Sequence, residues 1–232
     1  MAGILYGIGV GPGDPDLITI KAIKTIRDCD VIAAPDTGKS RSVAFEIAKQ
    51  AVPEIAQKEF AELAMPMTRD RKRLEKSHQQ AADQVIVYLN QGKNVAFLTL
   101  GDPSVYSTYM YIHDLVCTAG YQAQMIAGVP SFCAVAAKLG ISLTKADQPF
   151  YVIPASYRCL DEELDRKATK VLMKSGKAIE QVKNLLLEKK LLPNAKMVQK
   201  CGMKGERVFA SLEEADNDAG YFSIIVVKGE AE

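Results

Sequence analysis

The residues best suited to bind a small molecule follow an apolar run from Phe97 to Leu100. The run predicts a strand buried on both faces. The strand is expected to end at Gly101-Asp102-Pro103. From Ser104 onward the sequence predicts the capped start of a helix. Ligands of open α/β sheets bind outside the carboxyl ends of the strands. The turn would offer them backbone N–H groups, the Asp102 carboxylate and small hydroxyls. An ordinary junction with aspartate as turn former explains the same residues.

A glycine-rich loop follows the first predicted strand, between Gly7 and Gly13. The dinucleotide-binding pattern G-x-G-x-x-G fails here, because Pro12 or Asp14 stands where its third glycine is needed. No G-x-x-x-x-G-K-[ST] pattern of a P-loop occurs in the chain. Nicotinamide binding therefore has weak support, and Asp14 followed by Pro15 predicts the N-terminus of a helix instead.

Metal and covalent chemistry have little support in the sequence. Its two histidines, His78 and His113, belong to no His-x-x-x-His pair, and no Cys-x-x-Cys occurs, so no metal site is predicted. No G-x-S-x-G nucleophile elbow is present either. Nothing in the sequence therefore indicates covalent catalysis.

Basic side chains gather in two loops at or near predicted strand ends. One interpretation is a set of solvated charges leading into a helix. The other is a set of cations for an acidic substrate that bears several carboxylates. The residues concerned are Lys39, Arg41, Arg69, Arg71, Lys72 and Arg73.

The composition is that of an ordinary globular protein. The chain has 232 residues, of which 48% are hydrophobic and 25% charged, and its formal net charge is +1. This charge argues against nucleic acid as a partner. No apolar run approaches the ~20 residues of a membrane span, and the N-terminus has no signal-type pattern. The five scattered cysteines favour a reducing compartment, so we expect a cytoplasmic protein.

Strands alternating with helices predict an α/β fold with a parallel sheet in the first half of the chain. The second half predicts shorter strands and a mixed sheet. We expect one domain over residues 1–125 and another over 126–232, and an antiparallel hairpin of the last two strands. The strands are expected at 3–9, 31–34, 60–65, 97–100, 121–127, 150–153, 170–173, 196–199, 207–210 and 222–227. The helices are expected at 17–26, 42–50, 74–89, 106–119, from 131 and at 179–190.

Three separated motifs resemble those of the tetrapyrrole (corrin/porphyrin) methylases. They are the run from Val10 to Thr19, Gly101-Asp102-Pro103, and the run from Gly128 to Phe132. Leu172-Met173 and Cys201-Gly202 stand where later segments of that family contact the methyl donor. Within the family, the residues after Gly101-Asp102-Pro103 are most similar to members that methylate carbon 20 of precorrin-2 or cobalt-factor II in cobalamin biosynthesis.

The resemblance implies two α/β domains with a ligand cleft between them, a homodimer, an acidic tetrapyrrole substrate and S-adenosyl-L-methionine as donor, with S-adenosyl-L-homocysteine as product. If the basic loops bind this substrate, the residues expected to do so are Lys39, Arg41, Arg69, Arg71 and Arg73. The sequence departs from the family pattern at Leu100, where many members have a second glycine, and at Cys201, which replaces a smaller residue. The donor-binding residues that it implies are Pro12, Leu100, Gly101, Asp102, Val105, Tyr106, Ser131, Phe132, Met173, Cys201 and Gly202.

Methyl transfer to carbon is a direct displacement that needs aligned reactants and no protein nucleophile. A base is needed only to remove a proton afterwards, and Asp102, Tyr106, Tyr109 or the substrate itself is a candidate. Alternative acceptors are another corrin carbon, a histidine derivative of a translation factor or a ribosomal nucleoside. A nicotinamide-binding module is a further alternative. The sequence does not determine whether the macrocycle carries cobalt.

Overall fold

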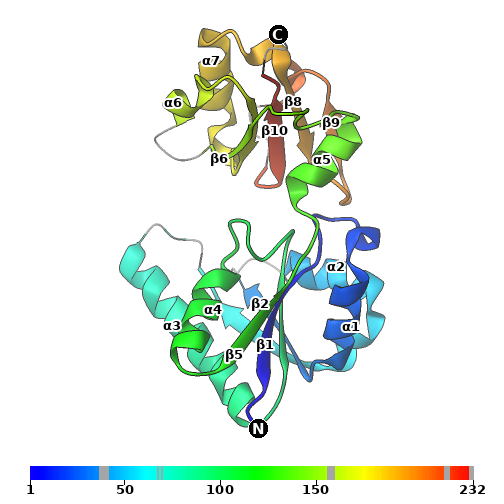
Figure 1. Ribbon diagram of the computed structural model, residues 1–232, viewed down its shortest axis with the longest axis vertical. Helices are drawn as coiled ribbons and strands as arrows, with labels where there is room; N and C mark the ends of the chain where they lie inside the picture. Colours follow the sequence, from blue (N-terminus) through cyan, green and yellow to red (C-terminus); the bar gives the residue numbers. More distant parts are fainter. Residues whose placement is uncertain (37–41, 67, 69, 156–159, 217–219, 230–232) are drawn as a thin grey trace. The chain divides into compact units, whose positions relative to one another are not determined.

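Each half of the chain forms its own sheet in the computed structural model (Figure 1). The structure describes residues 1–36, 42–66, 68, 70–155, 160–216 and 220–229. The chain divides into two units, Met1–Pro130 and Ser131–Glu232, and each is described by itself below.

The first unit is built on a parallel sheet of order β3-β2-β4-β1-β5. Its side chains are buried on both faces: Leu5 and Phe97 on one face and Ile8 and Leu98 on the other are all fully buried. This burial explains the continuous apolar runs in the sequence and confirms the predicted parallel sheet. The strands are β1 (Ile4–Gly9), β2 (Val31–Asp36), β3 (Glu59–Ala64), β4 (Val95–Thr99) and β5 (Gln122–Ile126).

Helices cover both faces of this sheet (Figure 1). Helices α3 and α4 pack together, and their residues Val85 and Ile112 belong to the same apolar cluster as Leu5 and Phe97. Helix α1 contacts β1, and α2 contacts β4. The helices are α1 (Ile20–Asp28), α2 (Val43–Ala51), α3 (Arg71–Asn90) and α4 (Tyr109–Thr118), with short 3-10 turns at Pro15–Leu17 and Pro53–Gln57. No helix among the described residues is long and apolar enough to cross a membrane.

The first helix begins later than the sequence predicted. Asp14 does act as an N-cap, and its carboxylate accepts a hydrogen bond from the Asp16 N–H at 3.0 Å. The turn it caps is only Pro15–Leu17, however. A second cap then starts α1, because the Thr19 hydroxyl accepts from the Ala22 N–H at 3.1 Å.

The helix expected to begin at Ser104 also begins later, at Tyr109. The Asp102 carboxylate accepts from the Ser104 N–H at 2.8 Å, which closes a local turn instead of a helix. Tyr106 has φ +49, a left-handed conformation that a right-handed helix cannot contain. Residues 102–108 are therefore a loop at the carboxyl end of β4.

Tyr109 is a core residue of the first unit. Its side chain is fully buried and packs under β1, where a Cβ on Gly7 would lie 2.2 Å from the ring. Its hydroxyl donates to the Gln124 carbonyl at 3.0 Å and pairs with His113 Nδ1 at 2.9 Å. Burial raises the pKa of the Tyr109 phenol well above its usual range. The ring therefore joins α4, β1 and β5.

The second unit has a mixed sheet of order β6-β7-β10-β8-β9, as the sequence predicted. The predicted hairpin of the last two strands is wrong, because β9 pairs with β8 and β10 lies between β7 and β8. All five residues of β10 are buried, so it takes the centre of the sheet, whereas the short, mostly exposed β9 takes an edge. The strands are β6 (Phe150–Pro154), β7 (Thr169–Met173), β8 (Ala195–Gln199), β9 (Arg207–Phe209) and β10 (Ser223–Val227).

Helices cover this second sheet as well (Figure 1). Helix α5 contacts β8 and β10. Leu164 of α6 and Leu186 of α7 share an apolar cluster with Leu172 and Ile225 of the strands. The helices are α5 (Ser131–Leu139), α6 (Leu160–Leu164) and α7 (Ile179–Glu188), with 3-10 turns at Gly176–Ala178, Leu192–Asn194 and Leu212–Glu214.

We expect Tyr109→Phe to lower the free energy of unfolding by about 1–2 kcal/mol, because it removes the hydroxyl of a fully buried side chain that donates to the Gln124 carbonyl and pairs with His113. The matched control is Tyr111→Phe on the same helix, whose side chain is exposed and stacks on His78. It should change the stability by less than about 0.5 kcal/mol. Denaturant unfolding followed by circular dichroism measures both. Equal effects of the two substitutions would contradict the structural role of the Tyr109 hydroxyl.

Candidate functional site

The connections of the first sheet change direction at the neighbouring strands β1 and β4. From β1 the chain crosses through α1 to β2, and from β4 it crosses through α4 to β5. These two helices lie on opposite faces of the sheet (Figure 1). The connections that follow β1 and β4 therefore lead to opposite faces, which makes this point of the carboxyl edge the expected ligand site of an open α/β sheet. Residues 10–14 and 100–108 form the loops with which these two connections begin.

Three glycines allow the backbones to meet at this edge. A Cβ on Gly9 would lie 2.5 Å from the Gly101 carbonyl oxygen, and one on Gly128 would lie 2.1 Å from the same atom. Gly101 also bridges to Gly11, with N–H···O distances of 2.8 Å and 3.3 Å in the two directions. Gly11 and Gly101 both have positive φ, 77 and 71, which glycine adopts without strain. All three sequence motifs are thus joined through their glycines.

The Asp102 carboxylate fastens this arrangement. One oxygen accepts from the Gly128 N–H at 2.9 Å, and the other accepts from the Ser104 N–H and hydroxyl. Both oxygens are therefore engaged by donors of the protein itself. This bonding explains Asp102 as a positioning residue that links the loop after β4 to the loop after β5, rather than as a base.

The other predicted residues of this loop differ in their exposure. Pro12 is buried beside Gly11, whereas Leu100 and Val105 are half-buried and Tyr106 is 46% exposed. Thr99 and Ser107 pair through their hydroxyls at 2.7 Å. Leu100, Val105 and Tyr106, together with the half-buried Asp102, are thus the predicted donor-binding residues of this unit that are at least partly exposed.

The predicted donor-binding residues of the second unit follow strands that end at one edge of its sheet. Because β10 is antiparallel to both β7 and β8, these two strands run in the same direction. Met173 ends β7, and Cys201 and Gly202 follow β8. The Gly202 N–H donates to the Glu206 carboxylate at 2.7 Å. This hydrogen bond, together with Lys138 at 2.7 Å, lowers the pKa of Glu206.

The start of α5 and the residue after β7 also belong to the surroundings of the predicted donor-binding residues of the second unit. Ser131 and Phe132 open α5, and the Phe132 ring lies 6.2 Å from Phe150. Lys174, directly after Met173, has φ +57, and burial lowers the pKa of its ammonium group. The sequence reasoning missed Lys174, since no pattern marks a positive φ at a lysine.

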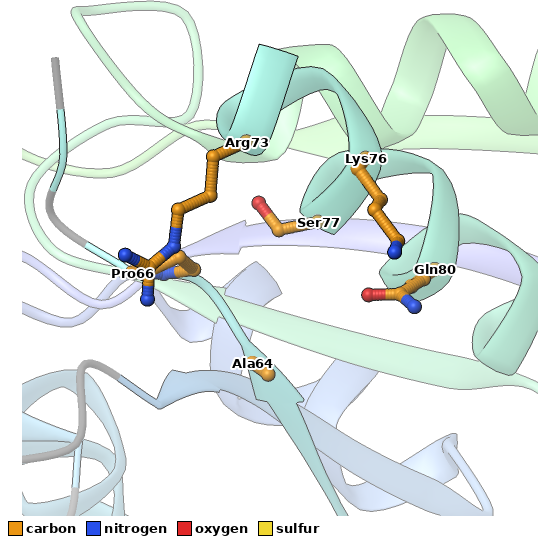
Figure 2. Close-up of a pocket in the computed structure, with 6 residues that line it drawn as sticks. All are labelled: Ala64, Pro66, Arg73, Lys76, Ser77 and Gln80. Carbon is orange, nitrogen blue, oxygen red and sulfur yellow. The ribbon is translucent and has the colours of Figure 1, made fainter. Parts of the chain in front are cut away.

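Of the basic residues predicted to bind substrate, the two that the structure describes, Arg71 and Arg73, lie in different environments. Lys39, Arg41 and Arg69 lie outside the described residues. Arg71 pairs with Glu75 at 3.1 Å, and its side chain is 91% exposed. This agrees with the first interpretation, in which the basic side chains are solvated charges leading into a helix. Arg73 instead lines a hollow of about 320 Å³ between β3 and α3 (Figure 2).

The hollow contains residues that the sequence reasoning missed. Lys76, Ser77 and Gln80 of α3 line it together with Arg73, opposite Ala64 and Pro66. The signal was present in the spacing, because positions 73, 76, 77 and 80 recur at the period of one helix face. Among the described residues, no group of three or more His, Cys, Asp and Glu is arranged to hold a metal ion.

Comparison with known proteins gives the family. The family model of the tetrapyrrole (corrin/porphyrin) methylases matches residues 4–216. The chain belongs to this family. The resemblance of the three motifs is thereby confirmed, as are the expected fold class and the expected enzyme class, a methyltransferase.

Several relatives of this methylase match over nearly its whole length. A probable cobalt-precorrin-2 C(20)-methyltransferase of Methanocaldococcus jannaschii is 31% identical, with 97% of this chain and 95% of that protein covered. The cobalt-precorrin-2 C(20)-methyltransferase of Salmonella typhimurium is also 31% identical, with 98% and 97% covered. The cobalamin biosynthesis protein CobIJ of Mycobacterium tuberculosis is 31% identical over 98% of this chain, which spans only 46% of that longer protein.

Solved structures share the fold of this methylase. The cobalt precorrin-4 methyltransferase CbiF superposes with a TM-score of 0.73 at 24% identity, covering 97% of this chain and 94% of that one. A putative cobalamin synthesis related protein (CobF) from Corynebacterium diphtheriae superposes with a TM-score of 0.75 at 19% identity, covering 99% of each chain.

We expect Asp102→Asn to destabilise the first unit by about 1–3 kcal/mol, because the new amide turns its N–H₂ toward either the Gly128 or the Ser104 N–H. Ser104→Ala removes only one neutral hydroxyl and should cost about 0.5–1.5 kcal/mol. Urea unfolding at neutral pH ranks the two variants. The positioning role is refuted if Asp102→Asn is no less stable than wild type.

Proposed function

We propose that this methylase transfers a methyl group from S-adenosyl-L-methionine to carbon 20 of precorrin-2 or cobalt-factor II in cobalamin biosynthesis. The observation that carries the proposal is the 31% identity to proteins named as C(20)-methyltransferases, over 97–98% of this chain and 95–97% of those proteins. A precorrin-2 C(20)-methyltransferase of Sinorhizobium, 29% identical over 98% of this chain, agrees. The near-neutral composition supports a small-molecule acceptor over RNA.

The glycine contacts support the donor that the family implies. The buried glycines Gly9, Gly11 and Gly101 let the backbones of β1 and of the loops after β1 and β4 approach closely at the carboxyl edge, where ligands of open α/β sheets bind. One related structure, a uroporphyrin-III C-methyltransferase from Thermus thermophilus, is described as complexed with S-adenosyl homocysteine, at 20% identity and a TM-score of 0.68. The bound donor supplies an electrophilic methyl group on a sulfonium.

The chain's own part in the reaction is to orient the donor and the acceptor and to exclude water from them. Methyl transfer breaks the S–CH₃ bond and forms a C–CH₃ bond at a meso carbon that is already a nucleophile, so no enzyme nucleophile is required. In the first unit, we assign this work to the backbone of Gly101 and to the half-buried Leu100 and Val105. The assignment of Ser131, Phe132, Met173, Cys201 and Gly202 in the second unit to the donor stays a prediction.

The methylated carbon then loses its proton. Of the three candidate acceptors, Asp102 has both oxygens engaged and Tyr109 is fully buried, whereas Tyr106 is 46% exposed. We therefore keep Tyr106 and the substrate itself as candidates. The homodimer and the cytoplasmic location implied earlier likewise stay predictions.

Another carbon of the macrocycle is the alternative acceptor. A cobalt-precorrin-4 C(11)-methyltransferase of Methanocaldococcus jannaschii is 32% identical over 59% of this chain, so the family fold alone does not select the carbon. The full-length matches to C(20) enzymes favour carbon 20.

Parallel incubations of the protein with metal-free and with cobalt-loaded substrate test the proposal. The purified protein should bind S-adenosylhomocysteine saturably in calorimetry and add one methyl group to precorrin-2 or to its cobalt-loaded form. Mass spectrometry detects the added methyl group, and a ¹³C-labelled donor locates it by NMR. A label on any other carbon supports the alternative, and no donor binding overturns the whole assignment. The form that turns over faster identifies whether cobalt precedes methylation.

A further inference from the structure

The hollow between β3 and α3 in the first unit is built for an anion. Arg73, Lys76 and Gln80 all lie on one face of α3, and each carries N–H donors. Figure 2 shows Arg73 reaching toward Pro66, while Lys76 and Gln80 both point to the strand side. Arg73 thus lies at the Pro66 end of a space of about 320 Å³, and Lys76 and Gln80 lie at its other end, so two positive charges and an amide line it.

The positive charges of this hollow have no carboxylate partner among the described residues of the unit. Across the described residues, neither Arg73 nor Lys76 forms an ion pair with a carboxylate. Glu75 is engaged by Arg71, and Asp70 caps α3 by accepting from the Arg73 N–H at 3.2 Å. Two cations facing one hollow without a counter-ion repel each other, and a bound anion would relieve this repulsion.

The other residues that line the hollow indicate which kind of chemical group carries the anion. Ala64 and Pro66 form an apolar side at the carboxyl end of β3. Ser77 is 6% exposed, and its hydroxyl already donates to the Leu74 carbonyl at 2.9 Å, so it closes the hollow without adding charge. An apolar wall opposite a cationic wall matches a carboxylate on a short hydrocarbon arm better than it matches an inorganic ion.

We infer that this hollow binds one carboxylate-bearing side chain of the tetrapyrrole, with Lys76 and Gln80 as binding residues beside Arg73. The inference rests on the proposed function, because that function supplies an acidic macrocycle. The guanidinium of Arg73 pairs with the carboxylate, Lys76 adds a second charge, and the Gln80 amide donates a neutral hydrogen bond. The hollow lies at the carboxyl edge of β3 in the same sheet as β1 and β4, so it fixes the macrocycle through a peripheral arm.

The test uses uroporphyrin, a stable tetrapyrrole whose side chains are all carboxylates, as the probe for binding. Fluorescence titration of the full chain should give a Kd for uroporphyrin that rises roughly 5–20-fold in Lys76→Gln and in Arg73→Gln. Lys76→Arg, which keeps the charge, should restore most of the affinity. Lys24→Gln on α1 is the matched control, since it removes an equal charge from an exposed helix position of the same unit.

Two further readouts separate a binding role from a structural one. The Kd for S-adenosylhomocysteine and the thermal midpoint should be the same in wild type and in all these variants. In turnover with the macrocycle, Lys76→Gln should raise KM and leave kcat nearly unchanged.

The outcomes distinguish this inference from the proposed function. Suppose that the wild-type protein methylates the macrocycle but the variants bind uroporphyrin as tightly as wild type. The inference about the hollow is then wrong, and the proposed function still holds. Wild-type protein that binds uroporphyrin through Lys76 and Arg73 but transfers no methyl group supports the hollow and overturns the function. Failure of the wild-type protein to bind uroporphyrin overturns the hollow outright, and so does an equal loss of affinity in Lys24→Gln.

Discussion

The first unit depends on the close approach of backbones at Gly9, Gly101 and Gly128. No side chain fits at Gly9 or Gly128, since a single Cβ there would lie within 2.5 Å of the Gly101 carbonyl oxygen. The Asp102 carboxylate holds the contact by accepting from the Gly128 N–H. A cluster of this kind brings the ends of β1, β4 and β5 together at the carboxyl edge of the sheet. The same constraint therefore fixes the positions of the loops that carry the predicted donor-binding residues.

This constraint changes the interpretation of the most conspicuous acidic residue. Asp102 stands in a motif where ligands bind, which made it a candidate base and a donor ligand. In the structure, Ser104 donates to one of its oxygens and Gly128 to the other, so it acts on the site through the loops that it joins. Tyr109 gives a similar lesson, because its hydroxyl is used inside the core by Gln124 and His113. A polar residue near a site is a catalyst only if its polar atoms remain available.

The two edges that carry the predicted donor residues share one architectural reason. In each unit, strands that run in the same direction end together, at β1 and β4 in the first and at β7 and β8 in the second. Loops that follow parallel strands collect at one edge, where side chains from distant parts of the sequence become neighbours. The hollow beside β3 extends this logic along the first sheet, since it too lies at a carboxyl end.

The sequence by itself determined the α/β class, the alternation of strands and helices, and the three glycine motifs, because burial on both sheet faces and tight turns restrict residue types locally. It also determined the family, since the motifs occur in one order along nearly the whole chain. Only the tertiary structure decided the pairing of β10 with β7 and β8 and the late start of α4. It also decided the separate environments of Arg71 and Arg73, two residues apart on one helix. The strand pairing depends on partners that lie far away in the sequence. The late start of α4 and the environment of Arg71 depend instead on which of several local hydrogen bonds and ion pairs forms, which residue types alone do not specify.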